Sequence, residues 1–162
     1  MTQLPLESAG RINALITLYC ESHYDVDLGR GGVATMRIGE PAPPDVVRWI
    51  GADRIAFYIT SCNPHSQSLT REENEQRLHT LRTFLDDRGF SYLEGAGHIP
   101  GEAWREDCLL VRGISEADVS ELVRAHEQNS IVVVRDGAPT ALRLYRPDWR
   151  AVVGERTDVE WA

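Results

Sequence analysis

The sequence contains no lysine, since all 17 of its basic residues are arginine. Chemistry that needs a lysine amine is therefore excluded, which removes Schiff-base formation, a lysine general base and a lysine-dependent phosphate loop. Basic residues are also outnumbered, because 25 acidic residues leave a net charge of −8 with histidine neutral. A surface field of that sign repels polyanions, so we expect neither nucleic acid nor an anionic membrane as a partner.

Cysteine is scarce as well, with three widely spaced residues and no C-x-x-C pair. Such a set predicts neither a disulfide framework nor a thiolate zinc site, and it fits a reducing compartment. The N-terminus has no basic start followed by an apolar run, and no stretch approaches 18 apolar residues. We therefore expect a cytoplasmic protein without a metal or another cofactor.

Apolar spacing and turn residues predict the first elements of the chain. We expect a helix over Leu4–Ser22 with Ser8 as a candidate cap, then a β-hairpin over Tyr24–Ile38 and a short helix over Pro44–Gly51. The hairpin turn is Gly29-Arg30-Gly31-Gly32. A phosphate loop is excluded there, because no helix follows this turn.

The centre of the chain alternates strands and helices. A strand over 55–60 precedes a long helix that starts at the capping box Thr70–Glu73 and ends at Gly89. Strands over 90–93 and 109–111 flank a glycine-rich connection, and a helix capped by Ser115 leads to a strand over 131–134. This order predicts an α+β fold with a ferredoxin-like βαββαβ core sheet covered by helices.

The remaining segments extend this core. We expect the N-terminal helix and hairpin to cover it and Thr140–Tyr145 to add a C-terminal strand at a sheet edge. With 42% hydrophobic residues the chain can bury a core of its own, so residues 1–150 are predicted to form a single domain. Because Glu155 to Ala162 has little to bury, residues 151–162 are predicted to be a structureless tail.

Strand direction then predicts a shared site, because the alternation of strands and helices fixes the end of the sheet at which each loop lies. Four segments that are distant in sequence bring polar side chains and one tryptophan to the same end, which we call the polar rim. Its candidate residues are Asn63, His65, Ser66, Glu73, Asn74, Arg77, Trp104, Glu106, Gln128 and Asn129.

These residues resemble the bacterial domain of unknown function 3293 family. The resemblance covers roughly residues 10 to 140 and rests on an Asn-Pro-x-Ser motif followed by Glu-Asn-x-x-Arg, then on Gly95, Gly97, Trp104 with Glu106, and Gln128-Asn129. His65 and Cys108 depart from the pattern, since the first position is not fixed as histidine and serine is common at the second. The family implies no activity that can be transferred to this chain.

Each candidate has a functional and a structural interpretation. Glu73, Glu106 and His65 are candidates for acid–base catalysis, whereas Arg77 would neutralise a negative ligand and Trp104 would exclude water. The amides and Ser66 would orient the ligand through hydrogen bonds. Alternatively, Glu73 serves only the capping box, and Arg77 pairs with Glu73 on the helix surface.

Cys62 and His65 also have more than one interpretation. Cys62 could be a nucleophile or a buried thiol at the end of a strand. Together with His65 it forms a C-x-x-H pair, but no second pair has the spacing that a zinc site needs. No metal site is therefore predicted.

The sequence leaves open whether the protein is an enzyme. The leading hypothesis is binding of a small polar or anionic molecule at the polar rim, as in a cofactor-free hydrolase, lyase or isomerase. The alternative is a non-enzymatic interaction or regulatory module that uses the sheet face or an edge strand, for example in a homodimer. A third possibility is a polar network that only holds loops together.

Overall fold

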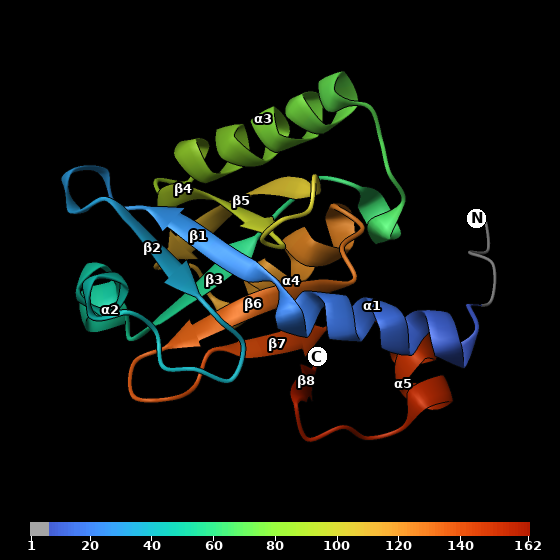
Figure 1. Cartoon of the computed structure of the whole chain (residues 1–162). Helices are drawn as coiled ribbons and strands as arrows, with labels where there is room; N and C mark the ends of the chain where they lie inside the picture. Colours follow the sequence, from blue (N-terminus) through green and yellow to red (C-terminus); the bar gives the residue numbers. More distant parts are fainter. Residues whose placement is uncertain (1–6) are drawn as a thin grey trace.

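The computed structural model describes residues 7–162, which form five α-helices and one eight-stranded sheet (Figure 1). The expected start of the first helix at Leu4 lies outside the described residues. The elements are α1 Ala9–Glu21, β1 His23–Asp27, β2 Val33–Met36, α2 Pro44–Ile50, β3 Ile55–Ile59, α3 Arg71–Asp87, β4 Ser91–His98, β5 Arg105–Arg112, α4 Glu116–Ala125, β6 Ser130–Arg135, β7 Ala141–Leu144, α5 Pro147–Val153 and β8 Val159–Trp161.

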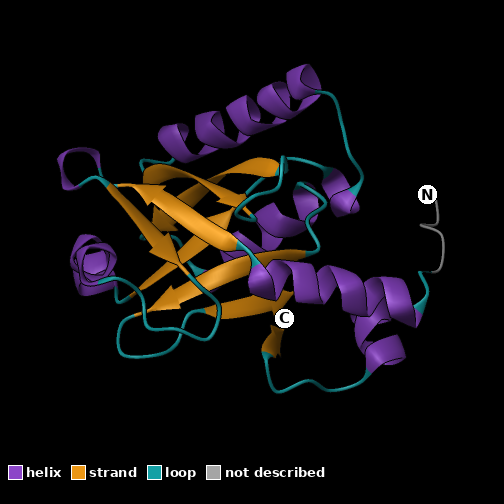
Figure 2. Cartoon of the chain, in the orientation of Figure 1, coloured by secondary structure: helices purple, strands orange, loops and turns teal. Residues whose placement is uncertain are grey.

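The sheet is curled, and helices pack against both of its faces (Figure 2). The strand order is β2-β1-β4-β5-β3-β6-β7-β8. Every neighbouring pair is antiparallel except β7 and β8, which are parallel. The expected α+β class is consistent with this mixture of helices and a mainly antiparallel sheet.

Alternation along β3 shows how the two faces of the sheet are buried. Phe57 and Ile59 pack with the apolar stripes of α3 and α4, whereas Ala56 and Tyr58 point to the opposite face. That second face is covered by α2 at one end and by α1 and α5 at the other. Burying one large apolar side chain contributes about 1.5–3 kcal/mol, so these two layers fix the position of the helices.

The predicted helix caps and hairpin are confirmed. Ser8 accepts a hydrogen bond from the Arg11 backbone N–H, and Ser115 accepts one from Asp118. Both halves of the Thr70–Glu73 capping box are formed. The hairpin pairs β1 with β2 over the expected turn.

The glycine-rich connection is shorter than predicted. Gly95 and Gly97 belong to β4 and Glu106 belongs to β5, which leaves only residues 99–104 as a loop. Gly95 is glycine because the β1 backbone and the Tyr58 side chain lie against it. A Cβ there would lie 2.1 Å from the Asp25 carbonyl oxygen and 2.7 Å from the Tyr58 hydroxyl. Glycine thus permits a close approach within the sheet rather than a turn.

The predicted structureless tail after Arg150 is wrong. Helix α5 continues to Val153, and β8 pairs with β7, so the Thr140–Tyr145 strand is not an edge. The edges are β2 and β8. Ion pairs from Arg135 and Arg143 to Glu160 hold β8 in place. No helix in residues 7–162 combines the length and hydrophobicity needed to cross a membrane.

Candidate functional site

The loops at the polar rim hold residues in an unusual backbone conformation. Asn63, His65, Ser66 and Glu127 have φ values of 45°, 51°, 59° and 56°, in the left-handed region. They are four of the five non-glycine residues with positive φ in the described chain. Each costs about 1–3 kcal/mol and persists only where the surroundings enforce it. The backbone N–H of His65 donates to the Glu127 carbonyl at 2.7 Å, which joins the two loops.

Helix α3 fixes these loops through the Glu-Asn-x-x-Arg motif. The Asn74 side chain accepts from the Asn63 backbone N–H and donates to the Asn63 carboxamide oxygen, both at 2.9 Å. The Arg77 guanidinium donates to the carbonyl oxygens of Ser61 at 2.6 Å and His126 at 2.7 Å. Asn74 and Arg77 are therefore positioning residues that hold one loop against the other.

Gln128 adds to this loop-holding network. Its amide nitrogen donates to the carbonyl oxygens of Cys62 and His126, both at 3.0 Å. For Asn74, Arg77 and Gln128 the third interpretation from the sequence is therefore supported, because their polar groups bond to the loops themselves.

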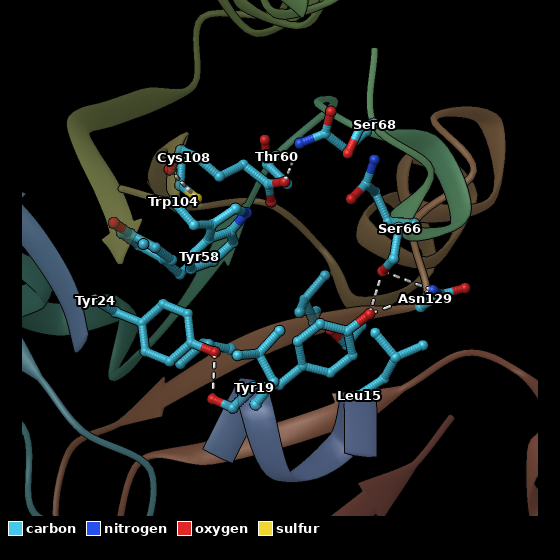
Figure 3. A pocket seen from close by; sticks show the side chains of 18 residues that line it. Leu15, Tyr19, Tyr24, Tyr58, Thr60, Ser66, Ser68, Trp104, Cys108 and Asn129 are labelled. Carbon is cyan, nitrogen blue, oxygen red and sulfur yellow. Dashed lines mark hydrogen bonds between the residues drawn. The ribbon is translucent and has the colours of Figure 1, made fainter. Parts of the chain in front are cut away.

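A cavity of about 250 Å³ lies beside these loops, between the sheet and α1 (Figure 3). Its apolar surface comes from aromatic rings and aliphatic side chains, and hydroxyl, amide and carboxyl groups lie between them. Ser68, one of the lining residues, is exposed, so the cavity reaches the surface there. The lining residues are Leu15, Leu18, Tyr19, Tyr24, Tyr58, Thr60, Asn63, Ser66, Ser68, Gly97, Trp104, Glu106, Cys108, Gln128, Asn129, Ser130, Ile131 and Val132.

A row of paired residues across three strands shapes one wall of the cavity. Tyr24 on β1 pairs with Gly97 on β4, and Gly97 pairs with Glu106 on β5. A Cβ at Gly97 would lie 3.5 Å from the Tyr24 ring and 3.7 Å from the Trp104 ring. The glycine thus lets both aromatic rings lie close to the strand next to the Glu106 carboxyl.

Asn63 fixes the Glu106 carboxyl. The Asn63 carboxamide oxygen accepts from the Leu69 backbone N–H at 3.0 Å, so its NH₂ group must face the other way. That NH₂ donates to Glu106 Oε2 at 2.9 Å. Burial raises the pKa of Glu106 to about 7, although the Asn63 hydrogen bond opposes this effect. Glu106 can therefore both accept and release a proton near neutral pH.

Asn129 organises the opposite wall (Figure 3). Its carboxamide oxygen accepts from Arg146 Nη1 at 2.9 Å, and because arginine only donates, the Asn129 NH₂ must face the cavity. This NH₂ donates to the Ser66 hydroxyl at 3.0 Å and the Tyr19 hydroxyl at 3.3 Å. The two hydroxyls also bond to each other. That bond uses one of their two protons, and the other remains available to a ligand.

The predicted rim residues fall into three groups. Six line the cavity, namely Asn63, Ser66, Trp104, Glu106, Gln128 and Asn129. Two, Asn74 and Arg77, hold the loops from outside it. The last two, Glu73 and His65, are not among the lining residues.

Glu73, a candidate for acid–base catalysis, serves the capping box instead. The Glu73 carboxylate is exposed and accepts from the Thr70 backbone N–H at 2.9 Å. His65 lies behind Asn129, with Nδ1 3.5 Å from the Asn129 carboxamide oxygen and Nε2 3.5 Å from a Glu127 carboxylate oxygen. Neither residue faces the cavity, because each already serves a neighbouring loop or helix end.

Residues 59–131 match the family described as "Protein of unknown function (DUF3293)". Over this segment, the chain is similar to the DUF3293 family. The resemblance found in the sequence is thereby confirmed over residues 59–131, a shorter range than the expected 10 to 140, and this segment contains every predicted rim residue. Comparisons with curated proteins and with solved structures each gave no significant match.

The cavity also uses residues outside the segment that matches the family. Tyr19 and Tyr24 come from α1 and β1, and Arg146, which orients Asn129, precedes α5. These residues could not be identified from the sequence. Tyr19, for example, continues the apolar stripe of a helix. Alternation would have found Tyr58, which is two residues before Thr60 and points to the same face.

The thiols at the site do not have the character of nucleophiles. Burial raises the pKa of Cys62 and of Cys108, so both remain protonated at neutral pH. Within residues 7–162, no group of three His, Cys, Asp or Glu side chains is arranged to hold a metal ion. Glu106 is left as the group best placed for acid–base chemistry.

Proposed function

We propose that this protein is a cofactor-free enzyme that binds a small polar molecule in the cavity and exchanges a proton with it through Glu106. The observation that carries the proposal is the setting of this carboxyl. Glu106 lies among aromatic side chains, and Asn63 fixes one of its oxygens at 2.9 Å. A positioned carboxyl in an enclosed apolar site is a typical general acid or base.

Hydrogen bonding on the two walls supports a division of roles. Glu106 Oε2 is held by Asn63, and Oε1 takes no hydrogen bond from residues 7–162, so it is the oxygen that meets the ligand. Across the cavity, the hydroxyls of Tyr19 and Ser66 have one proton to donate. A base on one wall and a hydrogen-bond donor on another suit proton abstraction next to a group that gains negative charge.

This arrangement favours a lyase or an isomerase over a hydrolase with a serine nucleophile. A nucleophilic serine needs a base within hydrogen-bond distance of its hydroxyl. The Ser66 hydroxyl instead contacts Tyr19 and the Asn129 amide, neither of which is a base. Burial also raises the pKa of Tyr19, so its hydroxyl stays protonated.

The alternative of an interaction module has less support. A docking face is expected to show a large exposed apolar patch. In residues 7–162 the exposed large hydrophobic side chains are Val33 and Val152, on β2 and α5. Two side chains on separate elements do not form such a patch.

For the fold, we infer that β3-α3-β4-β5-α4-β6 is a ferredoxin-like core. The support is the order β4-β5-β3-β6 within the sheet, with all three pairs antiparallel. In addition, α3 and α4 pack on the same face as Phe57. The remaining strands extend this core on both sides.

The proposed activity is tested by proton exchange. The purified protein is incubated in D₂O with a pool of small polar metabolites, and mass spectrometry records deuterium uptake and product formation. We expect uptake or conversion of at least one compound, reduced about 100-fold or more in Glu106→Gln. Glu73→Gln is the matched control, because glutamine also completes a capping box, and it should keep wild-type activity.

Either of two results would refute the proposal. One is a Glu106→Gln variant that is as active as the wild type. The other is a wild-type protein that neither exchanges nor converts any compound of the pool.

A further inference from the structure

We propose that the cavity selects small organic cations, such as compounds with a protonated or quaternary ammonium head group. The proposal rests on the proposed function, since it names the ligand class of the same cavity. Three observations carry it: the charge of the lining residues, the presentation of the aromatic rings, and the hydrogen bonds that occupy the nearby arginines.

Glu106 is the single charged side chain among the lining residues of the cavity in the described chain. None of the 17 arginines lines it. Arg77, the arginine expected to bind a negative ligand, is occupied by the carbonyl oxygens of Ser61 and His126. An anion in this cavity would lose its hydration and gain no positive partner, whereas a cation would gain the Glu106 carboxylate.

Four aromatic side chains line the cavity, and the hydroxyls of two of them donate to backbone carbonyls. The Tyr24 hydroxyl donates to the Tyr19 carbonyl at 2.5 Å, and the Tyr58 hydroxyl donates to the Asp25 carbonyl at 2.6 Å. The rings of Tyr24 and Tyr58 pack edge to face, with centroids 5.6 Å apart. Both hydroxyl protons are therefore already used, and the rings remain available to contact a ligand (Figure 3).

Trp104 completes the aromatic surface next to Gly97. The faces of aromatic rings carry negative potential and attract cations within about 6 Å, most strongly for tryptophan. The aromatic rings and the carboxylate of this cavity thus both favour a cation. A neutral ligand of the same shape would gain only the burial of its apolar surface.

The arginines of a neighbouring groove do not reverse this preference. The groove shares Trp104 and Glu106 with the cavity and is lined by three arginines. Each of the three is already paired with a carboxylate: Arg71 with Glu75 at 2.8 Å, Arg82 with Glu94 at 2.7 Å and Arg105 with Asp107 at 4.0 Å.

The size of the cavity restricts the ligand to a small molecule. A cavity of roughly 150 Å³ in another protein binds benzene. The volume of about 250 Å³ found here therefore accommodates an ammonium group with a short substituent. Such a substituent can reach the hydroxyls of Ser66 and Tyr19 on the opposite wall.

The test uses three molecules of nearly equal shape and different charge: choline, 3,3-dimethylbutan-1-ol and 3,3-dimethylbutanoate. Each is titrated into the ¹⁵N-labelled full chain, and NMR chemical shifts of Gly97 and of the Trp104 indole report binding in the cavity. We expect choline to bind at least about tenfold more tightly than the alcohol at about pH 8, and the carboxylate to bind no better than the alcohol.

The pH dependence of choline affinity shows whether Glu106 is the group that attracts the cation. Choline carries a charge that does not titrate, so its affinity follows the ionisation of Glu106 and should rise about tenfold from about pH 6 to about pH 8. The other titratable groups whose charges act with or on Glu106 are Asp107 and Cys108 on β5, Cys62 after β3 and Tyr19 on α1. Burial raises the pKa of both thiols and of Tyr19, so these three stay neutral across this range.

Two variants complete the test. In Glu106→Gln, choline should lose about tenfold in affinity at about pH 8 and show no pH dependence, while the alcohol binds as before, which shows that the cavity is intact. Glu102→Gln removes an exposed charge from the loop between the same two strands and should change neither result.

Equal binding of choline and the alcohol would overturn the cation preference and leave the proton-transfer proposal standing. Binding of none of the three would also overturn it. The proton-transfer proposal fails only in the separate D₂O experiment, so the two failures can be told apart.

Discussion

Replacing Glu106 with glutamine removes a carboxyl whose ionisation is costly in the folded protein. Burial raises the pKa of Glu106 from 4.5 to about 7. Between these values the unfolded chain releases the proton and the folded chain keeps it, so the free energy of unfolding falls as the pH rises. The interval from 4.5 to about 7 is about 2.5 pH units, which at 1.36 kcal/mol per unit corresponds to about 3 kcal/mol.

The sign of the effect follows from the direction of the pKa change. The contribution of protonated Glu106 to the free energy of unfolding is fully present below pH 4.5 and is lost once the pH exceeds about 7. Glu106→Gln cannot ionise and avoids this loss. The variant should therefore exceed the wild type by about 3 kcal/mol at about pH 8 and by less than about 1 kcal/mol at about pH 5.

Urea unfolding followed by tryptophan fluorescence measures this difference at each pH. Glu102→Gln provides the control, because it removes one negative charge from an exposed position of the neighbouring loop. A gain in Glu106→Gln that is the same at both pH values, or that is matched by Glu102→Gln, would show that burial of the carboxyl is not its origin.

Three further substitutions test the frame around the cavity by the same unfolding assay. Arg77→Ala leaves two loop carbonyls without their donor and should cost about 2–4 kcal/mol, whereas Arg48→Ala on the surface of α2 should cost much less. Gly95→Ala brings a methyl group within 2.1 Å of a β1 carbonyl and should cost about 3 kcal/mol or more. Gly10→Ala in α1 meets no atom within 4 Å and should raise stability by up to about 1 kcal/mol. Equal costs for the two arginines, or a tolerated Gly95→Ala, would contradict these assignments.

Local signals predicted most of the elements. Ser8, Thr70 and Ser115 were identified as caps because each provides a hydroxyl directly before an apolar helical stripe. The glycines of β4 were misread, because a glycine in a turn and a glycine beneath a crossing side chain look alike in a sequence. Only the structure shows that Tyr58 and the β1 backbone lie against Gly95.

The C-terminal segment was missed for a related reason. Strand β8 spans just Val159–Trp161, and it is held by Glu160, which binds Arg135 and the buried Arg143. The sequence around an arginine in a strand does not indicate which carboxylate will form an ion pair with it. Ion pairs between distant segments therefore lie beyond local pattern analysis.

The candidate site was predicted in part. Strand direction brought Asn63, Glu106 and Asn129 to one end of the sheet, and all three line the cavity. The roles of Glu73 and Arg77 could not be decided from the sequence, because a helix-capping carboxylate and a catalytic one occupy the same motif. The aromatic wall was missed, since nothing in the sequence of α1 indicates that Tyr19 faces Ser66.

The floor of the cavity comes from α1, which lies outside residues 59–131. Changes confined to that helix, such as at Leu15 or Tyr19, would reshape the chamber while every residue of the shared motif stayed in place. Two chains with the same Asn-Pro-x-Ser and Glu-Asn-x-x-Arg signature could accordingly accept different molecules. Recombinant fragments limited to the matched stretch would lack six of the eighteen residues that line the cavity.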